Sequence, residues 1–230
     1  REALEGHVEE THRMLLRHLL EPADRPSHRW RLHVRRLHDD VGREEEHGGG
    51  DVRLLRRDPG ALVSWAVSVV SVGMNYYTDN RANEQPGMGR IARYAWGKDY
   101  HTVMSRRLAQ LETKIVALAP GVTTRAYVDT GPIMEKAWAQ QAGLGWIGKH
   151  SNLVSAECGS WLLLGEILTT LDLKEDEPAT DLCGSCTLCI QACPTGALIH
   201  TEFDNVYIQP DICNGCGYCV VTCPFGVVDR

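Results

Sequence analysis

The pattern of hydrophobic and polar positions predicts a folded domain in the middle of the chain. Short apolar runs rich in valine or leucine are typical of buried strands, whereas apolar residues at helical spacing indicate helices. The expected elements, in chain order, are a strand at 66–74, a helix at 100–118, a strand at 125–129, a helix at 133–142, and a third strand or buried helix at 160–168. Because strands and helices alternate, we expect an α/β sandwich-like domain over residues 58–180.

The first 57 residues differ in character from this domain. They hold seven of the ten histidines, mixed with many arginines and glutamates. Residues 7–20 fit an amphipathic helix, and the run EEEHGGG at 44–50 is typical of a solvated linker. A histidine-rich stretch can bind metal. The simpler interpretation is a polar, weakly ordered leader, which we expect over residues 1–57.

The end of the chain carries the strongest chemical signal, because eight of the nine cysteines lie between Cys183 and Cys223. They form two copies of the run Cys-x-x-Cys-x-x-Cys-x-x-x-Cys-Pro. In bacterial ferredoxins this run binds 4Fe–4S clusters, and the fourth cysteine of each run ligates the other cluster. The predicted ligands are Cys183, Cys186, Cys189 and Cys223 for the first cluster, and Cys193, Cys213, Cys216 and Cys219 for the second.

Two alternatives for these cysteines are weaker. Structural zinc sites also use four cysteines, but usually as two pairs rather than as four in a row followed by proline. A disulfide framework needs an oxidising compartment, and the sequence shows no signal peptide. We therefore expect a bacterial-ferredoxin-like α+β module with two 4Fe–4S clusters over residues 181–230. The ninth cysteine, Cys158, is expected to be a small buried apolar residue.

The composition of the chain narrows the classes of function. The 230 residues are 43% hydrophobic and 23% charged, as in ordinary globular proteins. A net charge of −6 argues against a protein that is basic overall and binds nucleic acid by charge alone, although it allows local basic patches. No apolar run approaches the roughly 18 residues of a membrane span. We expect a cytoplasmic protein without a membrane partner.

A glycine-rich segment, GLGWIGK at 143–149, matches GxGxxG and most of a phosphate-binding loop. However, His150 stands where a phosphate loop needs Ser or Thr, and the segment follows a predicted helix rather than a strand. Two interpretations are left. We favour a loop that clears space for a bulky cofactor over a simple helix C-cap followed by a turn.

Several long motifs resemble those of the epoxyqueuosine reductases, cobalamin-dependent enzymes that act on a wobble base of tRNA. The motifs lie at 74–80, 90–101, 128–153, 159–173 and 181–198, within a resemblance that covers residues 58–199. It implies that the α/β domain binds cobalamin beside two 4Fe–4S clusters, which pass electrons to the cobalt. It also implies the reduction of epoxyqueuosine to queuosine in tRNA, with electrons from an external donor.

The resemblance further implies roles for individual residues. Asp129, in the motif VDTGP, matches the family's proton donor, and we expect it to be buried beside the cofactor with a raised pKa. His150 and Leu153 match a loop that lies against the corrin ring. From the residues alone, an aspartate before Gly-Pro at a strand end is more often a turn or cap residue.

Basic and aromatic residues interleave at 90–101, in the segment RIARYAWGKDYH. This mixture suits contact with nucleic acid or with the polar side arms of a cofactor. It also occurs on ordinary protein surfaces, so both interpretations stay open.

The last thirty or so residues depart from the reductase pattern. Their compact second cysteine run resembles the iron–sulfur subunit of formate dehydrogenases, which relays electrons. The alternative function is therefore an electron-transfer subunit of a larger oxidoreductase. Residues 58–199 distinguish the two hypotheses, because a relay subunit needs neither the VDTGP motif nor the glycine-rich loop.

Overall fold

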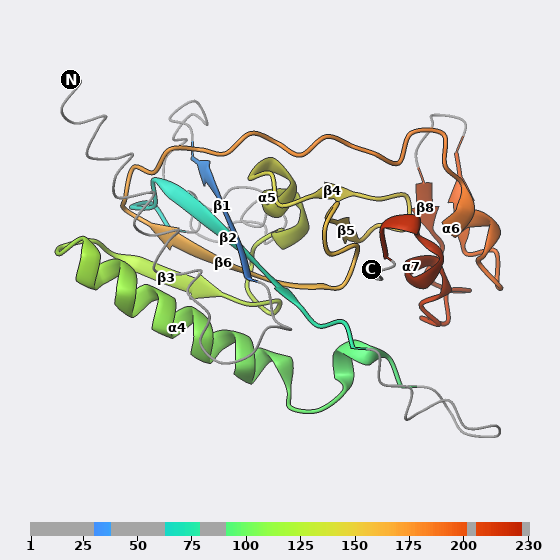
Figure 1. Ribbon diagram of the computed structural model, residues 1–230, viewed down its shortest axis with the longest axis horizontal. Coiled ribbons are helices and arrows are strands. Elements are labelled where there is room, and N and C mark those ends of the chain that lie inside the picture. Colours follow the sequence, from blue (N-terminus) through green and yellow to red (C-terminus); the bar gives the residue numbers. More distant parts are fainter. Residues whose placement is uncertain (1–29, 38–62, 79–90, 202–205, 227–230) are drawn as a thin grey trace, which may run out of the picture.

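A computed structural model describes residues 30–37, 63–78, 91–201 and 206–226 of the chain, and Figure 1 shows the arrangement of its elements. The strands are β1 Trp30–Arg36, β2 Ser68–Asn75, β3 Thr124–Tyr127, β4 Trp146–Ile147, β5 Leu153–Val154, β6 Leu162–Thr169, β7 Leu198–His200 and β8 Val206–Ile208. The helices are η1 Arg93–Ala95, α4 Tyr100–Leu118, α5 Glu135–Gln141, α6 Leu188–Gln191, α7 Tyr218–Thr222 and η2 Pro224–Gly226.

Four strands form one antiparallel sheet in the order β1-β2-β6-β3. The central strands β2 and β6 pair along all eight residues of each. Val69 and Val72 of β2 are both fully buried although they point to opposite faces of the sheet. The two apolar runs predicted at 66–74 and 160–168 are therefore strands, and the choice left open for the second is resolved as β6.

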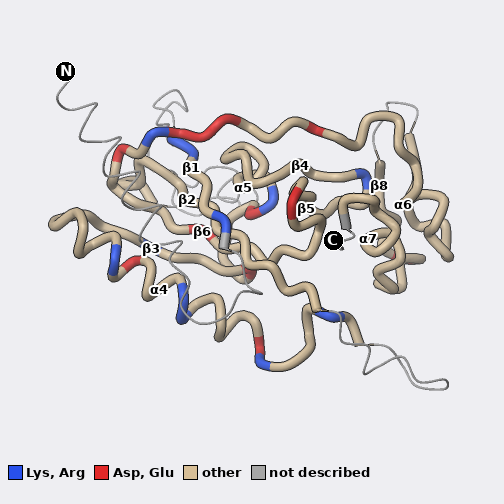
Figure 2. Tube along the Cα trace, viewed as in Figure 1, with Lys and Arg blue, Asp and Glu red and all other residues tan. Residues whose placement is uncertain are grey.

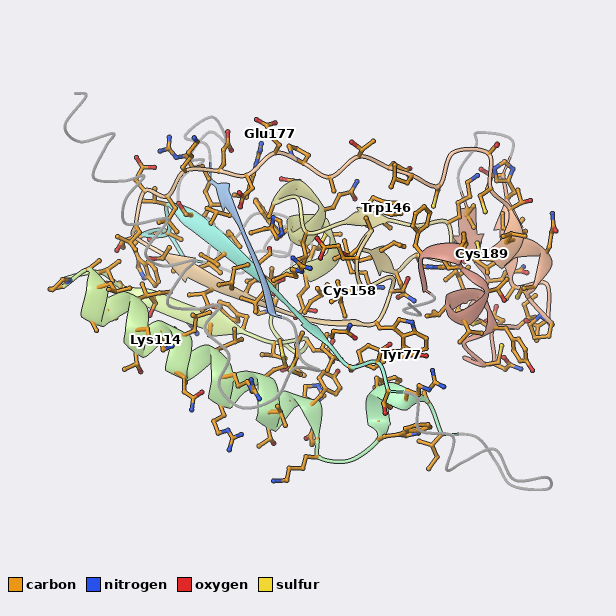
Figure 3. The ribbon with its side chains drawn as sticks, viewed as in Figure 1. Tyr77, Lys114, Trp146, Cys158, Glu177 and Cys189 are labelled. Atoms are coloured by element: carbon orange, nitrogen blue, oxygen red, sulfur yellow. The ribbon has the colours of Figure 1, made fainter. Side chains whose placement is uncertain are left out.

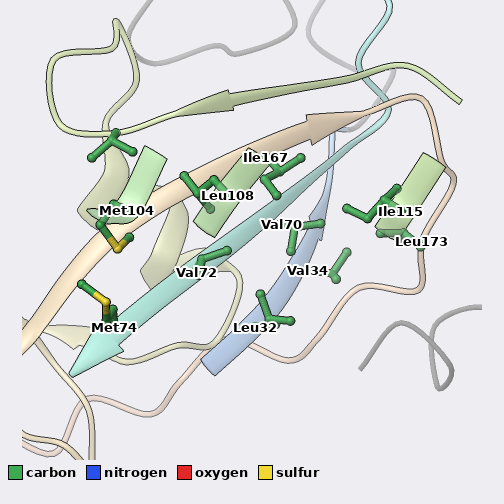
Figure 4. Close-up of a cluster of buried hydrophobic side chains, with 11 residues drawn as sticks. Leu32, Val34, Val70, Val72, Met74, Met104, Leu108, Ile115, Ile167 and Leu173 are labelled. Atoms are coloured by element: carbon green, nitrogen blue, oxygen red, sulfur yellow. The ribbon is translucent and has the colours of Figure 1, made fainter. Parts of the chain in front are cut away.

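Helix α4 covers one face of the sheet. It has the predicted bounds and begins at Asp99, whose side chain accepts a hydrogen bond from the backbone N–H of His101. Apolar residues at helical spacing lie on one side of the helix and pack against β1, β2 and β6 (Figure 4). The helical members of this main core are Met104, Leu108 and Ile115.

Helix α5 covers the opposite face. Trp138 and the preceding Ile133 pack against Val69 and Leu168 of the central strands. The helix is shorter than predicted, because its first regular residue is Glu135 and its last is Gln141. The middle of the chain therefore has mixed α/β structure, with a helix on each face of the sheet.

The expectation of a weakly ordered leader over residues 1–57 is wrong for part of that segment. Residues Trp30–Arg36 form β1 and pair with β2 along its length. Alternation places Leu32 and Val34 on the same face, where both are buried in the main core. The other expected features of the leader, at 7–20 and 44–50, lie outside the described residues.

The outer edge of β1 is covered by the acidic segment that follows β6. The backbone N–H of Val34 donates to the Asp176 carboxylate (2.8 Å), and the backbone N–H of Asp176 donates to the Val34 carbonyl (2.9 Å). Arg35 pairs with Glu175 at 3.1 Å, so basic β1 meets an acidic chain (Figure 2). This pairing satisfies backbone groups that an edge strand would otherwise leave open.

The cysteine-rich end forms a small module beside the α/β domain. Strands β7 and β8 form a hairpin, and the short helices α6 and α7 carry Cys189 and Cys219 respectively. Each cysteine run thus continues from a loop into a short helix. In the part of the chain that the structure describes, no helix has both the length and the apolar composition needed to cross a bilayer.

Candidate functional site

Asp129 lies on the turn between β3 and α5. Its backbone is left-handed, with φ of 44°, a conformation that aspartate tolerates better than most residues. The backbone N–H of Asp129 donates to the carboxylate of Glu135, in the first turn of α5. This turn aims the Asp129 side chain at the beginning of α4.

Two residues from the first turn of α4 contact the Asp129 carboxylate. The Tyr100 hydroxyl donates to Oδ2 at 2.6 Å, and Nε2 of His101 lies 3.0 Å from the same oxygen. The rings of Tyr100 and His101 stack with their centroids 4.0 Å apart. Asp129 is therefore held by neighbours that are far from it in sequence.

These contacts reverse the expected electrostatics of Asp129. The hydrogen bond from Tyr100, followed by the bond and charge of His101, lowers the pKa of Asp129, and burial opposes this only in part. Its side chain is 53% exposed. The expectation of a buried Asp129 with a raised pKa is therefore wrong for this structure, because hydrogen bonds favour the carboxylate.

The pKa values of the two residues that contact Asp129 shift in the opposite direction. Hydrogen bonds to Asp99 and then to Asp129 raise the pKa of His101. Burial and the hydrogen bond to Asp129 raise the pKa of Tyr100. At neutral pH the site thus combines an ionised carboxylate with a neutral phenol and an imidazole that favours its protonated form.

The glycine-rich segment closes α5 and packs tightly on the protein itself. The N–H of Gly143 donates to Gln140 O at 3.1 Å and the N–H of Leu144 donates to Ala139 O at 2.9 Å, which is the Schellman pattern of a helix end. A Cβ at Gly143 would collide with the Glu177 carbonyl. The helix C-cap interpretation is therefore confirmed, and a role of the segment beside a cofactor stays a prediction.

His150 is buried and uses both ring nitrogens within the protein. Nδ1 accepts from the backbone N–H of Asn152 at 3.2 Å, so Nε2 carries the proton that faces the Ser160 hydroxyl at 3.1 Å. Burial lowers the pKa of His150 and favours this neutral form. The Leu153 side chain is also buried. Contact of either residue with a corrin ring stays a prediction, and it would have to use the backbone of this loop.

Lys136 connects this loop to the Asp129 side of the site. Its Nζ donates to the Ser151 carbonyl at 2.8 Å and lies 3.1 Å from Asn152 Oδ1. Burial lowers its pKa, while the charges of Glu135 and Asp129 oppose that shift. The structure therefore brings the loop at 150–153 and the Asp129 turn together through the ammonium group of Lys136, which no local sequence pattern indicates.

The cysteine module contacts the α/β domain through Trp146 of β4. The indole N–H of Trp146 donates to the Cys183 sulfur at 3.4 Å, and its ring meets Phe225 edge-on at 5.0 Å between centroids. Cys183 and Cys223 belong to the same apolar cluster around Trp146. Figure 3 shows Trp146 on the side of the α/β domain that faces the module with Cys189.

Lys149 makes a second contact with the loop that begins the first cysteine run. Its Nζ donates to the carbonyls of Gly184 at 2.7 Å and Cys186 at 3.1 Å. The end of the glycine-rich segment therefore fixes the backbone between two predicted cluster ligands.

The cysteines of the two runs lie close enough to influence one another. Apart from burial, which is the largest cause, the pKa of Cys189 is raised by Cys183, Cys219 and Cys223, of which Cys219 belongs to the other predicted ligand set. Cys219 is affected by Cys216 and Cys193. The backbone N–H of Leu198 is the main cause that lowers the pKa of Cys193 to about 7, which favours the thiolate that a cluster needs.

These observations fit 4Fe–4S clusters, and the assignment of individual ligands stays a prediction. Within the described ranges, no three His, Cys, Asp or Glu side chains gather as they would around a single metal ion. Cys158 is separate from the module and is buried, as its lone position suggested.

Arg93 packs into an aromatic cluster close to the start of α4. Its guanidinium lies 5.3 Å from the ring centroids of Tyr77 and Trp161 and 5.7 Å from that of Trp96. The ring of Tyr94 meets Tyr100 edge-on at 6.2 Å. Arg93 and Trp96 of the basic-aromatic segment therefore join this aromatic packing, while Tyr94 is half exposed. Contact of the segment with nucleic acid or with a cofactor stays a prediction.

Two family models match the sequence. The model described as "Epoxyqueuosine reductase QueG, DUF1730" matches residues 56–130, and the model described as "4Fe-4S dicluster domain" matches residues 182–227. The second match confirms that the cysteine-rich end is a 4Fe–4S module of the ferredoxin type.

Curated relatives and solved structures agree with the first match. The epoxyqueuosine reductase of Synechocystis sp. is 51% identical over 138 residues, which are 60% of this chain and 48% of the relative. The Bacillus subtilis epoxyqueuosine reductase, with its catalytic aspartate loop swung out of the active site, has a TM-score of 0.75 and 23% identity. The match covers 95% of this chain and 66% of the Bacillus subtilis chain.

A crystal structure of epoxyqueuosine reductase with a tRNA-Tyr epoxyqueuosine-modified tRNA stem loop has a TM-score of 0.71 and 23% identity, covering 95% of this chain and 66% of that chain. The resemblance to the epoxyqueuosine reductases is confirmed, and the likeness in fold covers more of the chain than the likeness in sequence. The chain spans about half the length of the curated relatives it matches. The likeness of the last residues to a formate dehydrogenase subunit stays a prediction.

Proposed function

We propose that this chain reduces epoxyqueuosine in tRNA to queuosine, with electrons from an external donor passing through two 4Fe–4S clusters to cobalamin. The observation that carries this proposal is the 51% identity to a curated epoxyqueuosine reductase over 138 residues. A tRNA substrate would place the protein in the cytoplasm. An electron-transfer subunit, the alternative, would account for the cysteine module but not for this match.

The proposed organisation has two functional parts. Residues 58–180, together with strand β1, form a sandwich-like α/β domain that binds the corrin and the substrate, and residues 181–230 hold both clusters. The hydrogen bond from Trp146 to the Cys183 sulfur joins the parts where the first cluster would lie. Electrons would therefore enter the α/β domain close to the glycine-rich segment.

Several described residues fit a large corrin cofactor. Met134 and Ile147 are large apolar side chains that stay exposed on the segments flanking the Asp129 turn and the loop at 150–153, and burying them against a corrin would be favourable. Cobalamin, when bound, would supply the reducing power needed to open the epoxide. The protein's own part is to hold the substrate and to supply protons.

The balance of the reaction defines the task of Asp129. Conversion of an epoxide to an alkene and water consumes two electrons and two protons. Because a carboxyl group can give a proton to the oxygen released from the ring, Asp129 would deliver a proton at the exposed face of the site. Tyr100 and His101 hold its carboxylate in place for this step.

The test is turnover of a tRNA stem loop that contains epoxyqueuosine, measured by mass spectrometry after anaerobic reconstitution with iron, sulfide and cobalamin. The wild type should remove one oxygen atom from the base. Asp129→Asn should reduce the rate by about 10²- to 10⁴-fold with unchanged cluster absorbance. Full activity in this variant would exclude Asp129 as the proton donor, and an inactive wild type would argue against the function.

A further inference from the structure

His101 lies between two carboxylates at the start of α4. Its Nδ1 is 2.8 Å from Asp99 Oδ1, and its Nε2 is 3.0 Å from Asp129 Oδ2. The backbone N–H of His101 also donates to Asp99, the N-cap of the helix, at 2.9 Å. The helix start therefore fixes the ring so that a carboxylate oxygen faces each nitrogen.

This geometry determines how many protons the ring carries. An ionised carboxylate can only accept hydrogen bonds, and a neutral imidazole has a single N–H to donate. With both carboxylates ionised, both contacts are hydrogen bonds only if the ring is an imidazolium. The Asp99–His101–Asp129 unit thus stores one exchangeable proton within hydrogen-bond reach of Asp129.

The groups around this unit set where the proton rests. The Tyr100 hydroxyl donates to the same Asp129 oxygen, Glu135 accepts the Asp129 N–H, and the neighbouring ammonium of Lys136 adds positive charge. The hydrogen bond from Tyr100, the contact with His101 and the charge of Lys136 lower the pKa of Asp129, whereas the two carboxylates raise that of His101. The proton therefore rests on the ring rather than on Asp129.

We propose that His101 supplies the proton that Asp129 delivers, an inference that rests on the proposed function. As the substrate oxygen becomes basic, the Nε2–H bond of His101 breaks and an O–H bond forms on Asp129 Oδ2. Asp129 then passes this proton to the substrate oxygen, and no electron moves within the unit. His101 itself does not need to touch the substrate, because it acts only through Asp129. We therefore call it a positioning residue.

The same arrangement restores the proton after each transfer. The neutral ring can still donate Nδ1–H to Asp99, so it keeps its orientation. Its side chain is 38% exposed, and water can therefore reprotonate Nε2. An aspartate that is ionised in this structure can thus deliver a proton in every turnover.

The first test is an NMR titration of the His101 ring in the reconstituted protein, which needs no substrate. The midpoint should lie above the ordinary value of 6.5. Asp99→Asn should lower this midpoint, whereas Asp172→Asn, a carboxylate that pairs with Arg36 on the edge of the sheet, should leave it unchanged. A wild-type midpoint at or below 6.5, or one that Asp99→Asn does not move, would overturn the proposal.

The second test is the pH profile of stem-loop turnover. The wild-type rate should fall as the pH rises through the His101 midpoint, and Asp99→Asn should shift this fall to lower pH. His101→Gln keeps an N–H for Asp129 but has no proton to release, so it should lose the fall together with about 10²- to 10⁴-fold in rate. An unchanged profile in His101→Gln would show a merely structural role. A wild type without turnover would refute the proposed function, and the role of the relay with it, whatever the titration shows.

Discussion

Asp129 takes its chemical properties from residues 28 and 29 positions before it in the chain. Resemblance to a family identified the aspartate, but no local pattern in the sequence shows that the first turn of α4 meets the turn after β3. For that reason Tyr100 and His101 were noticed only as part of a basic-aromatic segment. The signal that could have found them is Asp-Tyr-His at the start of a predicted helix, where an aspartate cap fixes the following side chains.

Glu166 is a second residue whose state depends on its surroundings. It is fully buried in β6, and within the described residues neither of its carboxyl oxygens has a hydrogen-bond partner. Its cross-strand neighbours are Ser71 and Tyr127. Within the described residues, their hydroxyl groups are also buried without a hydrogen-bond partner. Burial and the charge of Glu135 raise the pKa of Glu166 well above 4.5, so the folded structure favours the neutral acid.

This raised pKa predicts a particular dependence of stability on pH. In the unfolded chain Glu166 ionises near 4.5, so the free energy of unfolding falls as the pH rises from there to the higher pKa of the folded state. Glu166→Gln removes this loss. The variant should gain stability relative to wild type by on the order of 1 kcal/mol per pH unit in that window. Urea unfolding at about pH 6 and about pH 8 checks this, and a pH-independent difference would contradict it.

At the scale of elements, hydrophobic periodicity correctly predicted the strands and helices that bury apolar residues at regular positions. The runs at 66–74 and 100–118 bury apolar residues on regular positions, and both are found as a strand and a helix. Strand β1 was missed because its buried apolar residues Leu32 and Val34 alternate with the basic residues Arg31, His33 and Arg35. Its stability comes from pairing with β2 and with an acidic segment distant in sequence.

Two glycines with nearly the same backbone conformation allow the packing of the glycine-rich segment to be tested. Gly143 has φ of 92° and Gly121 has φ of 90°, but only at Gly143 would a Cβ meet another part of the chain, the Glu177 carbonyl. Gly121→Ala should cost about 1–2 kcal/mol of stability from backbone strain. Gly143→Ala should cost about 1–3 kcal/mol more from overpacking. Equal losses in urea unfolding would show that the close contact with Glu177 is unimportant.

Trp146 of β4 offers a test of the contact between the domain and the first cluster. Hydrogen bonds to cluster sulfurs help set the reduction potential, so Trp146→Phe, which removes the N–H donated to Cys183, should make one potential more negative. Trp138→Phe changes a tryptophan of α5 that packs against Val69 and Leu168 of the sheet and is the matched control. Potentiometric titration followed by EPR measures both, and equal potentials in both variants would contradict the contact.

At the scale of the whole molecule, the sequence predicted the two-cluster module because its geometry is local. Each cysteine run spans only eleven residues, and its spacing alone indicates a 4Fe–4S loop. How this module sits on the α/β domain depends on Trp146 and Lys149, whose contacts join positions 35 to 37 residues apart. Such contacts form only in the folded chain, so the glycine pattern alone does not predict them.

The most direct test of the account is whether one chain joins two clusters to a corrin. Protein reconstituted anaerobically with iron, sulfide and cobalamin should, after desalting, retain about one cobalamin and two 4Fe–4S clusters per chain. EPR should show electrons from the reduced clusters reaching the bound cobalt. Two clusters without retained cobalamin, or a bound cobalamin that the reduced clusters cannot reduce, would contradict the account and favour an electron-transfer subunit.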